Sequence, residues 1–278
     1  VSSRGGGMRI NGSNPILRNV VINKNHGSRS GGIHVVNSNP TLDRVIIYGN
    51  SSSYDAVGMT LSGASHPTII NTIITNNVCE SSSCHAGGLF IGGESNPSVI
   101  NSIIWGNEVN ANFADIWNYY DEDFTYSIIG EIRIPIMGIG NIYEEDPLFG
   151  DPDNGDFTLQ GPDELFEGSP GIDAGTADID GDGEDDYGQW DYFGSAPDIG
   201  VFEWVSSFQH GGGDINQDLF LNILDVVMIM EFILGTQTPD ETQFSEADMN
   251  GDGLLNVLDV VVMVENILGG SLARGTTA

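Results

Sequence analysis

The first half of the chain repeats itself at intervals of 25, 26 and 30 residues. Glycine-led stretches that read GMRI, GIHV, GMTL and GLFI begin at Gly7, Gly32, Gly58 and Gly88. They alternate with four X-Pro segments, which are NPILRNVVINKN from Asn14, NPTLDRVIIYGN from Asn39, HPTIINTIITNN from His66 and NPSVINSIIWGN from Asn96. Self-similarity at such a period is typical of chains in which each unit stacks on the next. The repeat therefore predicts a solenoid.

Short β-branched runs in each unit favour strands over helices. Gly, Asn, Ser and Pro separate these runs, and no helical period is present. Apolar and polar residues alternate in the glycine-led stretches, as in strands with one face turned into a core. Four asparagines occupy one repeat position, namely Asn25, Asn50, Asn77 and Asn107. Stacked coils would align them in a ladder in which each amide bonds to the next.

This stretch resembles the right-handed parallel β-helix repeats of pectate-lyase-like surface proteins. The resemblance implies an all-β right-handed parallel β-helix over residues 1–142, with a further coil through residues 126–129. The coils lengthen at one corner, through the loops SSSYDA, VCESSSCHA and EVNANFAD, and such a ridge is a usual place for function. The sequence shows no capping element ahead of the first strand, so either the sequence is a fragment or a neighbour occupies the exposed edge.

Residues 143–204 form a second block. Its D-P-x-F, S-P-x-I-D-A-G and D-I-G-x-F-E elements begin at Asp146, Ser169 and Asp198. They resemble the closing region of secreted bacterial β-helix proteins, which implies the last coils and a cap. Residues 205–212 are then a short linker, residues 213–270 a separate module and residues 271–278 a tail.

Two twelve-residue loops in the last module have the ligand pattern of calcium sites. They read DINQDLFLNILD and DMNGDGLLNVLD, and they lie 34 residues apart. Ca²⁺ takes about six to eight oxygen ligands, which a tight loop supplies from alternate side chains and one backbone carbonyl. The expected ligands are Asp214, Asn216, Asp218, Phe220, Asn222 and Asp225 in the first loop, and Asp248, Asn250, Asp252, Leu254, Asn256 and Asp259 in the second.

The duplicated loop-plus-helix pattern resembles a dockerin, a small α-helical, EF-hand-like calcium module that attaches secreted bacterial proteins to cohesin partners. Asp225 and Asp259 at position 12 follow the dockerin form. Leu219 departs from it, because a sharp turn there ordinarily takes glycine. Positions 10 and 11, where cohesins read small polar or variable residues of dockerins, are Ile223-Leu224 and Val257-Leu258.

The segments after the two loops are too apolar for isolated surface helices. Residues 223–234 include 10 apolar residues in 12, and residues 257–268 include 9 in 12. A surface helix has one apolar stripe, so these helices need covering on more than one side. A membrane span takes about 20 residues, so these segments are too short to be one. We therefore expect the rest of this chain or a protein partner to cover both helices. The partner would be a cohesin-like module or another copy of this chain.

A third acidic loop, DIDGDGEDD at residues 178–186, has part of the calcium pattern. Asp178, Asp180, Asp182 and Asp186 fall at positions 1, 3, 5 and 9, whereas Gln189 stands at position 12. The loop is therefore either a third calcium site or a mobile acidic turn.

Charge and cysteine spacing limit the environment of the protein. The formal net charge is −32, and 30 of the 40 acidic residues follow Arg133. Nucleic acid and anionic membrane surfaces repel such a chain. Calcium loops suit an extracellular or bacterial cell-surface setting, where calcium is plentiful. Cys79 and Cys84 can form a short disulfide there, or they can be free thiols.

No nucleophile–base pair emerges from the sequence. The resemblance includes polysaccharide lyases and glycoside hydrolases, and hydrolases need two carboxyl groups about 5–9.5 Å apart. Asp43 and Arg44 are neighbours, which face opposite sides of a regular strand. Asp115 and the run 121–123 are the acidic candidates beside the long loops. The solenoid also offers aromatic residues for sugar stacking, which are Tyr48, Tyr54, Phe90, Trp105, Trp117, Tyr119 and Tyr120.

As a whole, the sequence indicates a non-catalytic, calcium-binding extracellular β-solenoid. We expect it to attach to a partner, or to self-assemble head to tail, through its C-terminal module. A head-to-tail contact that does not close gives fibres. The alternative is a polysaccharide-binding or polysaccharide-degrading β-helix protein anchored to a cohesin-type partner.

Overall fold

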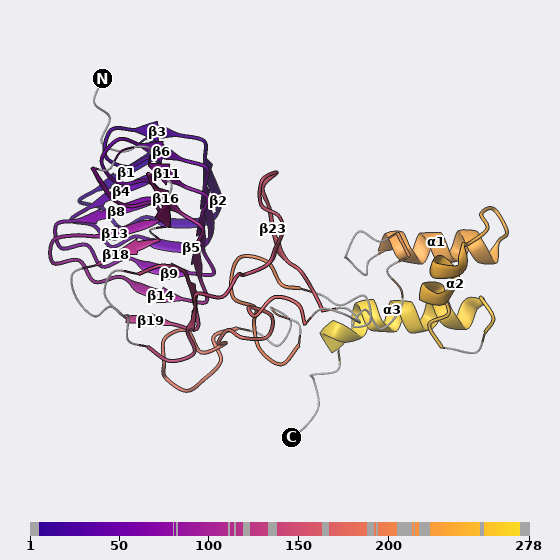
Figure 1. Ribbon diagram of the computed structural model, residues 1–278. Helices are drawn as coiled ribbons and strands as arrows, with labels where there is room; N and C mark the ends of the chain where they lie inside the picture. Colours follow the sequence, from indigo (N-terminus) through magenta and orange to yellow (C-terminus); the bar gives the residue numbers. More distant parts are fainter. Residues whose placement is uncertain are drawn as a thin grey trace. The chain divides into compact units, whose positions relative to one another are not determined.

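The computed structural model divides the chain into two units, residues 1–204 and residues 205–278. It describes residues 6–79, 81, 83–110, 112–113, 115–118, 123–132, 138–162, 167–187, 192, 194–204, 213, 215–216, 223–250 and 253–272. Figure 1 shows stacked strands in the first unit and helices in the second.

The first unit is a solenoid whose coils stack through parallel strands. One sheet contains β1 (Met8–Asn11), β4 (Ile33–Val36), β8 (Met59–Ser62), β13 (Leu89–Ile91) and β18 (Ile116–Trp117), in this spatial order. Every pairing in it is parallel, and one row across the coils contains Met8, Ile33, Met59, Leu89 and Ile116. The strands predicted from the glycine-led stretches are therefore confirmed.

A nine-stranded sheet forms a second side of the solenoid. In spatial order it contains β19 (Asp123–Thr125), β14 (Ser98–Ile100), β9 (Thr68–Ile70), β5 (Thr41–Tyr48), β10 (Ile73–Thr75), β15 (Ile103–Trp105), β20 (Ile128–Ile129) and β21 (Ile142–Tyr143), while β2 (Ile16–Asn23) pairs with β5. A residue with φ between 48° and 54° bends each coil within this sheet, at Asn19, Arg44, Asn71, Asn101 and Tyr126. Asparagine tolerates this conformation better than most other residues, which explains three of the five.

The bend corrects one expectation from the sequence. Arg44 stands at a positive φ rather than in a regular strand, and its guanidinium lies 3.7 Å from Asp43 Oδ1. The two side chains therefore form an ion pair, and the expectation that they face opposite sides is wrong. Asp43 Oδ2 also lies 3.0 Å from Arg18 Nε, one coil away.

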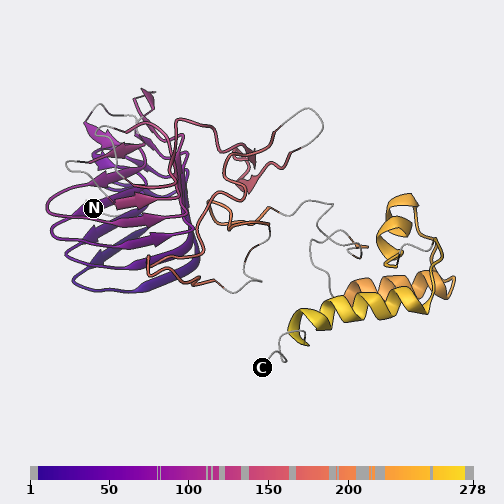
Figure 2. The ribbon, with the colours of Figure 1, turned by 90° about the horizontal axis from the view of Figure 1, so that it is seen from below.

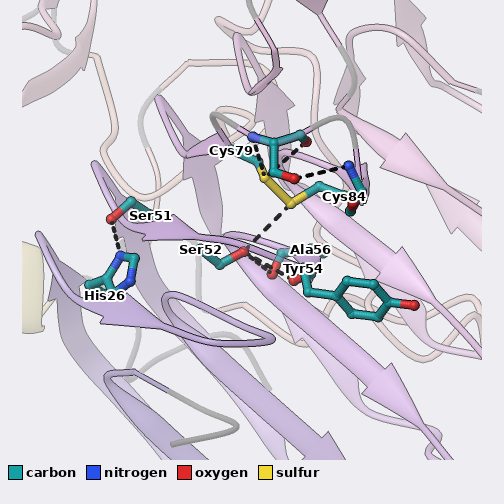
Figure 3. The surroundings of a disulfide bond; sticks show 9 residues. His26, Ser51, Ser52, Tyr54, Ala56, Cys79 and Cys84 are labelled. Carbon is teal, nitrogen blue, oxygen red and sulfur yellow. Dashed lines mark hydrogen bonds between the residues drawn. A yellow bond between two sulfur atoms is a disulfide. The ribbon is translucent and has the colours of Figure 1, made fainter. Parts of the chain in front are cut away.

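Shorter strands complete the coils and form the ridge. A third sheet contains β3 (His26–Gly27), β6 (Ser51–Ser52), β11 (Val78–Cys79), β16 (Glu108–Val109) and β17 (Asn112–Phe113), and β7 (Asp55–Ala56) pairs with β12 (Cys84–Ala86). Cys79 and Cys84 form a disulfide, the first of the two alternatives that their spacing allowed. Figure 3 shows this bond beside Ser52 of the coil before, whose Oγ lies 3.8 Å from Cys84 Sγ.

Aliphatic side chains fill the inside of the solenoid. They are stacked in rows because corresponding positions of successive coils pair in register. Burying one such side chain contributes about 1.5–3 kcal/mol. The rows include Ile33, Met59 and Leu89, then Val35, Leu61 and Ile91, and then Ile47, Ile74 and Ile104, all at most 2% exposed.

The predicted asparagine ladder is present. Nδ2 of Asn25 donates to Oδ1 of Asn50 (3.1 Å), Asn50 donates in the same way to Asn77 (2.9 Å), and Asn77 donates to Asn107 (2.9 Å). The backbone N–H groups of Asn25, Asn50 and Asn77 donate to the same acceptors. Each bonds to the Oδ1 that also accepts from Nδ2 of its own residue. After Asn107 the ladder passes to a carboxylate, because N and Nδ2 of Asn107 both donate to Oδ1 of Asp115, at 2.8 and 2.7 Å.

Residues 142–204 add one strand and then cover a side of the solenoid. β21 pairs with β20 at the edge of the nine-stranded sheet. Beyond it, β22 (Phe149–Asp151) and β23 (Asp156–Leu159) form an antiparallel pair. Outward-facing isoleucines of four coils pack here against the covering block, as a cluster of Ile46, Ile73, Ile103, Ile128, Phe149, Phe157, Leu159 and Ile199.

The second unit contains α1 (Ile223–Ile233), α2 (Glu241–Ala247) and α3 (Val257–Leu272). Figures 1 and 2 show α1 and α3 side by side and running in opposite directions. The prediction for the first helix agrees within one residue, whereas α3 continues past the predicted end at residue 268 into the expected tail. The core of the unit consists of Ile215, Val226, Ile229, Phe232, Ala247 and Met263.

The sequence analysis missed α2, although a local signal marks its start. Asp240 Oδ1 accepts from the backbone N–H of Gln243 (2.8 Å), and Gln243 Oε1 accepts from the backbone N–H of Asp240 (3.1 Å). This reciprocal pair is a capping box, which is readable from the sequence Asp-x-x-Gln.

Replacing Asn77 by alanine should lower the free energy of unfolding by roughly 2–6 kcal/mol, because two buried donors of Asn50 lose their acceptor at about 1–3 kcal/mol each. Asn25→Ala is the matched control, since Asn25 accepts from none of the described residues in the ladder. Urea unfolding followed by the strand signal in circular dichroism measures both. Equal losses in the two variants would contradict a ladder that locks the coils.

Candidate metal centre

Two carboxylates lie fully buried in the helical unit. Asp225 and Asp259 are 0% exposed, and each stands in the first turn of its helix, α1 or α3. A helix N-terminus stabilises negative charge, but a buried carboxylate needs a stronger partner. The only lysine or arginine after residue 204 is Arg274. A bound cation is therefore the partner that fits these two carboxylates.

Backbone N–H groups hold the second predicted loop in a closed turn. Gly253 N donates to Asp248 Oδ2 (2.8 Å), Asn250 N donates to Asp259 Oδ1 (3.3 Å), and Asn256 N donates to Asp259 Oδ2 (2.8 Å). Gly253 has a φ of 80°, the positive value for which glycine is needed at position 6. These bonds join positions 3 and 9 of the loop to Asp259 at position 12, and position 6 to Asp248 at position 1.

Leu254, at position 7, has its carbonyl oxygen in contact with Asn256 Nδ2, at 3.2 Å. Asp252, at position 5, lies outside the described residues. All the described candidates of this loop offer oxygen atoms, the donor type that Ca²⁺ prefers. The donor chemistry of the loop therefore fits calcium.

The described part of the first loop is arranged like the second. Ile215 N and Asn216 N donate to Asp225 Oδ1, at 2.9 and 3.3 Å. The bond from Asn216 corresponds to the bond from Asn250 in the second loop, 34 residues later. The remaining residues predicted here lie outside the described part of the chain, namely Asp214, Asp218, Leu219, Phe220 and Asn222.

The third acidic loop brings three of its four predicted ligands together. Asp178, Asp180 and Asp186 each offer an oxygen, all within 4.8 Å of one another, and they are the only such group among the described residues. Backbone N–H groups of Gly181 and Gly183 donate to the two oxygens of Asp178, at 2.7 and 3.0 Å.

Asp182 is not part of this group. Its Oδ1 instead accepts from the N–H of Glu184, at 2.8 Å. Gln189, which stands at position 12 of the pattern, lies outside the described residues. The loop therefore offers three clustered carboxylates where the pattern predicted four.

Each long helix also presents exposed apolar side chains. On α1 the exposed fractions are 66% for Ile223, 55% for Leu224 and 48% for Val227, and the residues 34 positions later on α3 are exposed by 65%, 56% and 46%. Equivalent side chains of α1 and α3 are therefore exposed to nearly the same extent, just as the two loops before these helices are duplicated. We call this set the apolar face; it consists of Ile223, Leu224, Val227, Val257, Leu258 and Val261.

Residues 212–268 match the family model of the dockerin type I domain. The C-terminal unit is a dockerin. Residues 1–127 match the family model of the right handed beta helix region, which gives the hand of the solenoid. No curated protein and no solved structure matches the chain. The resemblances stated from the sequence are thus confirmed for both parts.

Dockerin type I domains bind calcium and attach the proteins that carry them to cohesin partners. Proteins with dockerins are typically extracellular or located at the cell surface. Among the described residues, no helix has the length and apolar character needed to cross a membrane. The dockerin match thus implies attachment to a cohesin partner, and calcium binding is consistent with it.

Asp115, an acidic candidate of the solenoid, is part of the ladder. It is 1% exposed, and its Oδ2 accepts from the N–H of Glu131 (3.0 Å) while its Oδ1 accepts from Asn107. Burial raises the pKa of Asp115 to about 6, against the opposing effect of these hydrogen bonds. This role is hard to predict from the repeat, because Asp115 follows Asn107 by only 8 residues rather than by one repeat.

The aromatic candidates separate into different places. The ring of His85 lies 6.4 Å from Tyr54, 5.0 Å from Phe90 and 5.2 Å from Trp117, centre to centre, at the ridge. Tyr48 instead packs on Phe157 of the covering block, at 4.9 Å. Five further candidates are not described: residues 119–122 lie outside the described residues, and the side chain of Asp123 is undescribed.

The free energy of unfolding of the solenoid should fall as the pH rises from about 4 to about 6. The pKa of Asp115 is raised from 3.8 to about 6 in the folded chain, so folding favours its neutral form. That stabilisation is fully present below the pKa of Asp115 in the unfolded chain. It is lost as the pH rises through the pKa in the folded chain, which lowers the free energy of unfolding by about 1–3 kcal/mol. Asp198 shows the same direction, with a pKa of about 6.

Asp115→Asn isolates the contribution of Asp115. Urea unfolding at several pH values, with calcium held constant, should give a shallower pH dependence for this variant than for the wild type. The residual slope is expected from Asp198. Parallel pH profiles for the two proteins would show that Asp115 does not titrate differently on folding.

Proposed function

We propose that this protein is a non-catalytic, secreted β-solenoid that a calcium-organised dockerin attaches to a cohesin-type partner at a bacterial cell surface. The observation that carries the proposal is the apolar face. Its six side chains are exposed to nearly the same extent on α1 and α3, and they lie on both sides of the buried Asp225 and Asp259 in the sequence. A covering partner would explain why both helices are so apolar.

Calcium is the proposed organiser of this face. In the first loop we propose Asp214, Asn216, Asp218, Asn222, Asp225 and the carbonyl of Phe220 as ligands, and in the second loop Asp248, Asn250, Asp252, Asn256, Asp259 and the carbonyl of Leu254. For a third site we propose Asp178, Asp180 and Asp186, with Asp182 as a further candidate. An ion that binds only the folded state stabilises it by mass action.

The chemistry of the apolar face defines the partner. Fully burying a valine, leucine or isoleucine side chain contributes about 1.5–3 kcal/mol, so the face favours a partner with a complementary apolar surface. Hydrogen-bonding groups opposite these side chains would lose their water without gaining a bond. The dockerin match supports a cohesin as the occupant. Head-to-tail assembly, with a second copy of this chain as the occupant, is the competing outcome.

The non-catalytic role is supported by the state of Asp115. Its two oxygens already accept three hydrogen bonds, from Asn107 N, Asn107 Nδ2 and Glu131 N. With 1% exposure, it has little surface to offer a substrate. Asp115 therefore suits the end of the ladder better than a general acid.

Calcium stoichiometry tests the ligand sets. Titration calorimetry of the full chain should show three bound ions per molecule. Asp180→Asn should remove one ion without loss of helix signal, because the third loop lies in the solenoid unit. Asp259→Ala should remove one ion and also lower the helix signal in circular dichroism. An unchanged stoichiometry in Asp180→Asn would reject the third site, and the same result in Asp259→Ala would reject the second dockerin loop as a site.

Charged substitutions test the apolar face. Val227→Glu and Val261→Glu should each weaken binding to a type I cohesin by about tenfold or more, which corresponds to at least about 1.4 kcal/mol. The double variant should abolish binding, because a buried unpaired carboxylate is strongly disfavoured. Ser245→Glu on α2 is the matched control, since Ser245 is exposed and outside the face. Calorimetry measures the affinity, and light scattering of the chain alone measures self-association.

The two measurements separate the occupants. Loss of cohesin binding in the Val227 and Val261 variants supports the proposal. Loss of self-association with cohesin binding intact would assign the face to a second copy of the chain. Retention of both interactions in the double variant would overturn the docking role of the face. An unchanged calcium stoichiometry establishes that each variant is folded.

A further inference from the structure

Two adjoining cavities lie beside Trp105 in the solenoid unit. The larger has a volume of about 430 Å³, and its lining includes Trp105, Gly130 and the carboxylates of Asp115, Glu131, Glu144 and Asp146. The smaller has a volume of about 360 Å³, shares Trp105 and Asp146 with the first, and adds Glu108. Volumes of this size are typical of small-molecule sites.

The stacked coils build this place from separate segments. Trp105 ends β15 and pairs with Thr75 of the coil before, in register with Tyr48 of the coil before that. Gly130 leaves room between the indole ring and the ladder. A Cβ added there would lie 2.1 Å from Asp115 Oδ2 and 3.2 Å from Trp105 Cε3. The cavity therefore depends on glycine at this position.

The charge of the lining has one sign. None of the described residues that line the two cavities is a lysine or arginine. The described ion pairs join Asp43 to Arg18 and Arg44. Among the described residues, therefore, no ion pair includes Glu131, Glu144 or Asp146. Several like charges around a recess focus a negative potential there and attract cations.

The arrangement suits an organic cation better than a metal ion. The only group of three carboxylates close enough to share a metal, among the described residues, is the one at Asp178, Asp180 and Asp186. Trp105 instead offers an aromatic ring, whose electron-rich face attracts a cation within about 6 Å. Large organic cations also lose their bound water more readily than a divalent metal ion does, so they can pack directly against the indole ring.

We propose that the cavity beside Trp105 binds an organic ammonium group. The cation lies against the indole ring, and Glu131, Glu144 and Asp146 supply the opposite charge. This site is in the solenoid unit and is independent of the dockerin and its partner.

Choline is a suitable probe, because its uncharged carbon isostere has the same shape without the charge. Ligand-observed NMR of the full chain in saturating calcium should show saturable binding of choline, and the isostere should bind at least about tenfold more weakly. Added salt should weaken the binding of choline, since the attraction is electrostatic.

Four variants make the assignment specific. Trp105→Ala should weaken choline binding about tenfold, while Trp105→Phe, which keeps an aromatic ring, should retain most of it. Glu131→Gln should weaken binding severalfold. Glu94→Gln is the matched control, because Glu94 is an exposed carboxylate in a turn outside the lining, and it should leave binding unchanged.

Three results would overturn the proposal. They are the absence of saturable choline binding, equal binding of choline and its isostere, and undiminished binding in both Trp105→Ala and Glu131→Gln. Because Glu131→Gln is nearly isosteric and Trp105→Phe keeps an aromatic ring, a folding defect in Trp105→Ala alone does not decide the outcome.

Discussion

Hydrogen bonding between successive coils is the interaction on which the solenoid unit depends. Parallel pairing aligns equivalent positions, and the buried asparagines repeat that alignment in side chains. A slip by one residue would turn the inner isoleucines outward. The same register places residues that are far apart in sequence next to each other, as with Tyr54 and His85 at the ridge or Trp105 and Glu131 at the cavity.

Carboxylates have three different roles in this acidic chain. Asp115 is buried and ends a ladder of amides, and it is held by donors from two segments. Asp225 and Asp259 are buried in the first turns of α1 and α3, where we propose a calcium ion as their partner. Around Trp105 the carboxylates line a recess instead. Burial and geometry, rather than the net charge, distinguish these roles.

The repeat made much of the fold predictable, because strands, register and the asparagine ladder all follow from residues at a constant spacing. The calcium ligands stay a prediction, which rests on oxygen-bearing residues that alternate within twelve positions. Two other contacts could not be predicted from the repeat. They are the packing of Phe157 on the outer isoleucines and the bond of Asn107 to Asp115 at the end of the ladder, and each joins segments that are not one repeat apart. Composition predicted that both helices need a cover, but only the structure divides each into a buried and an exposed side.

The central claim is that calcium organises an attachment unit on a solenoid that holds itself together. Hydrogen exchange of the full chain, measured with calcium and then with a chelator, tests it most directly. The amides of α1 and α3 should lose their protection when calcium is removed, while those of β5, β10 and β15 should keep theirs. Unchanged protection of α1 and α3 without calcium would contradict the account.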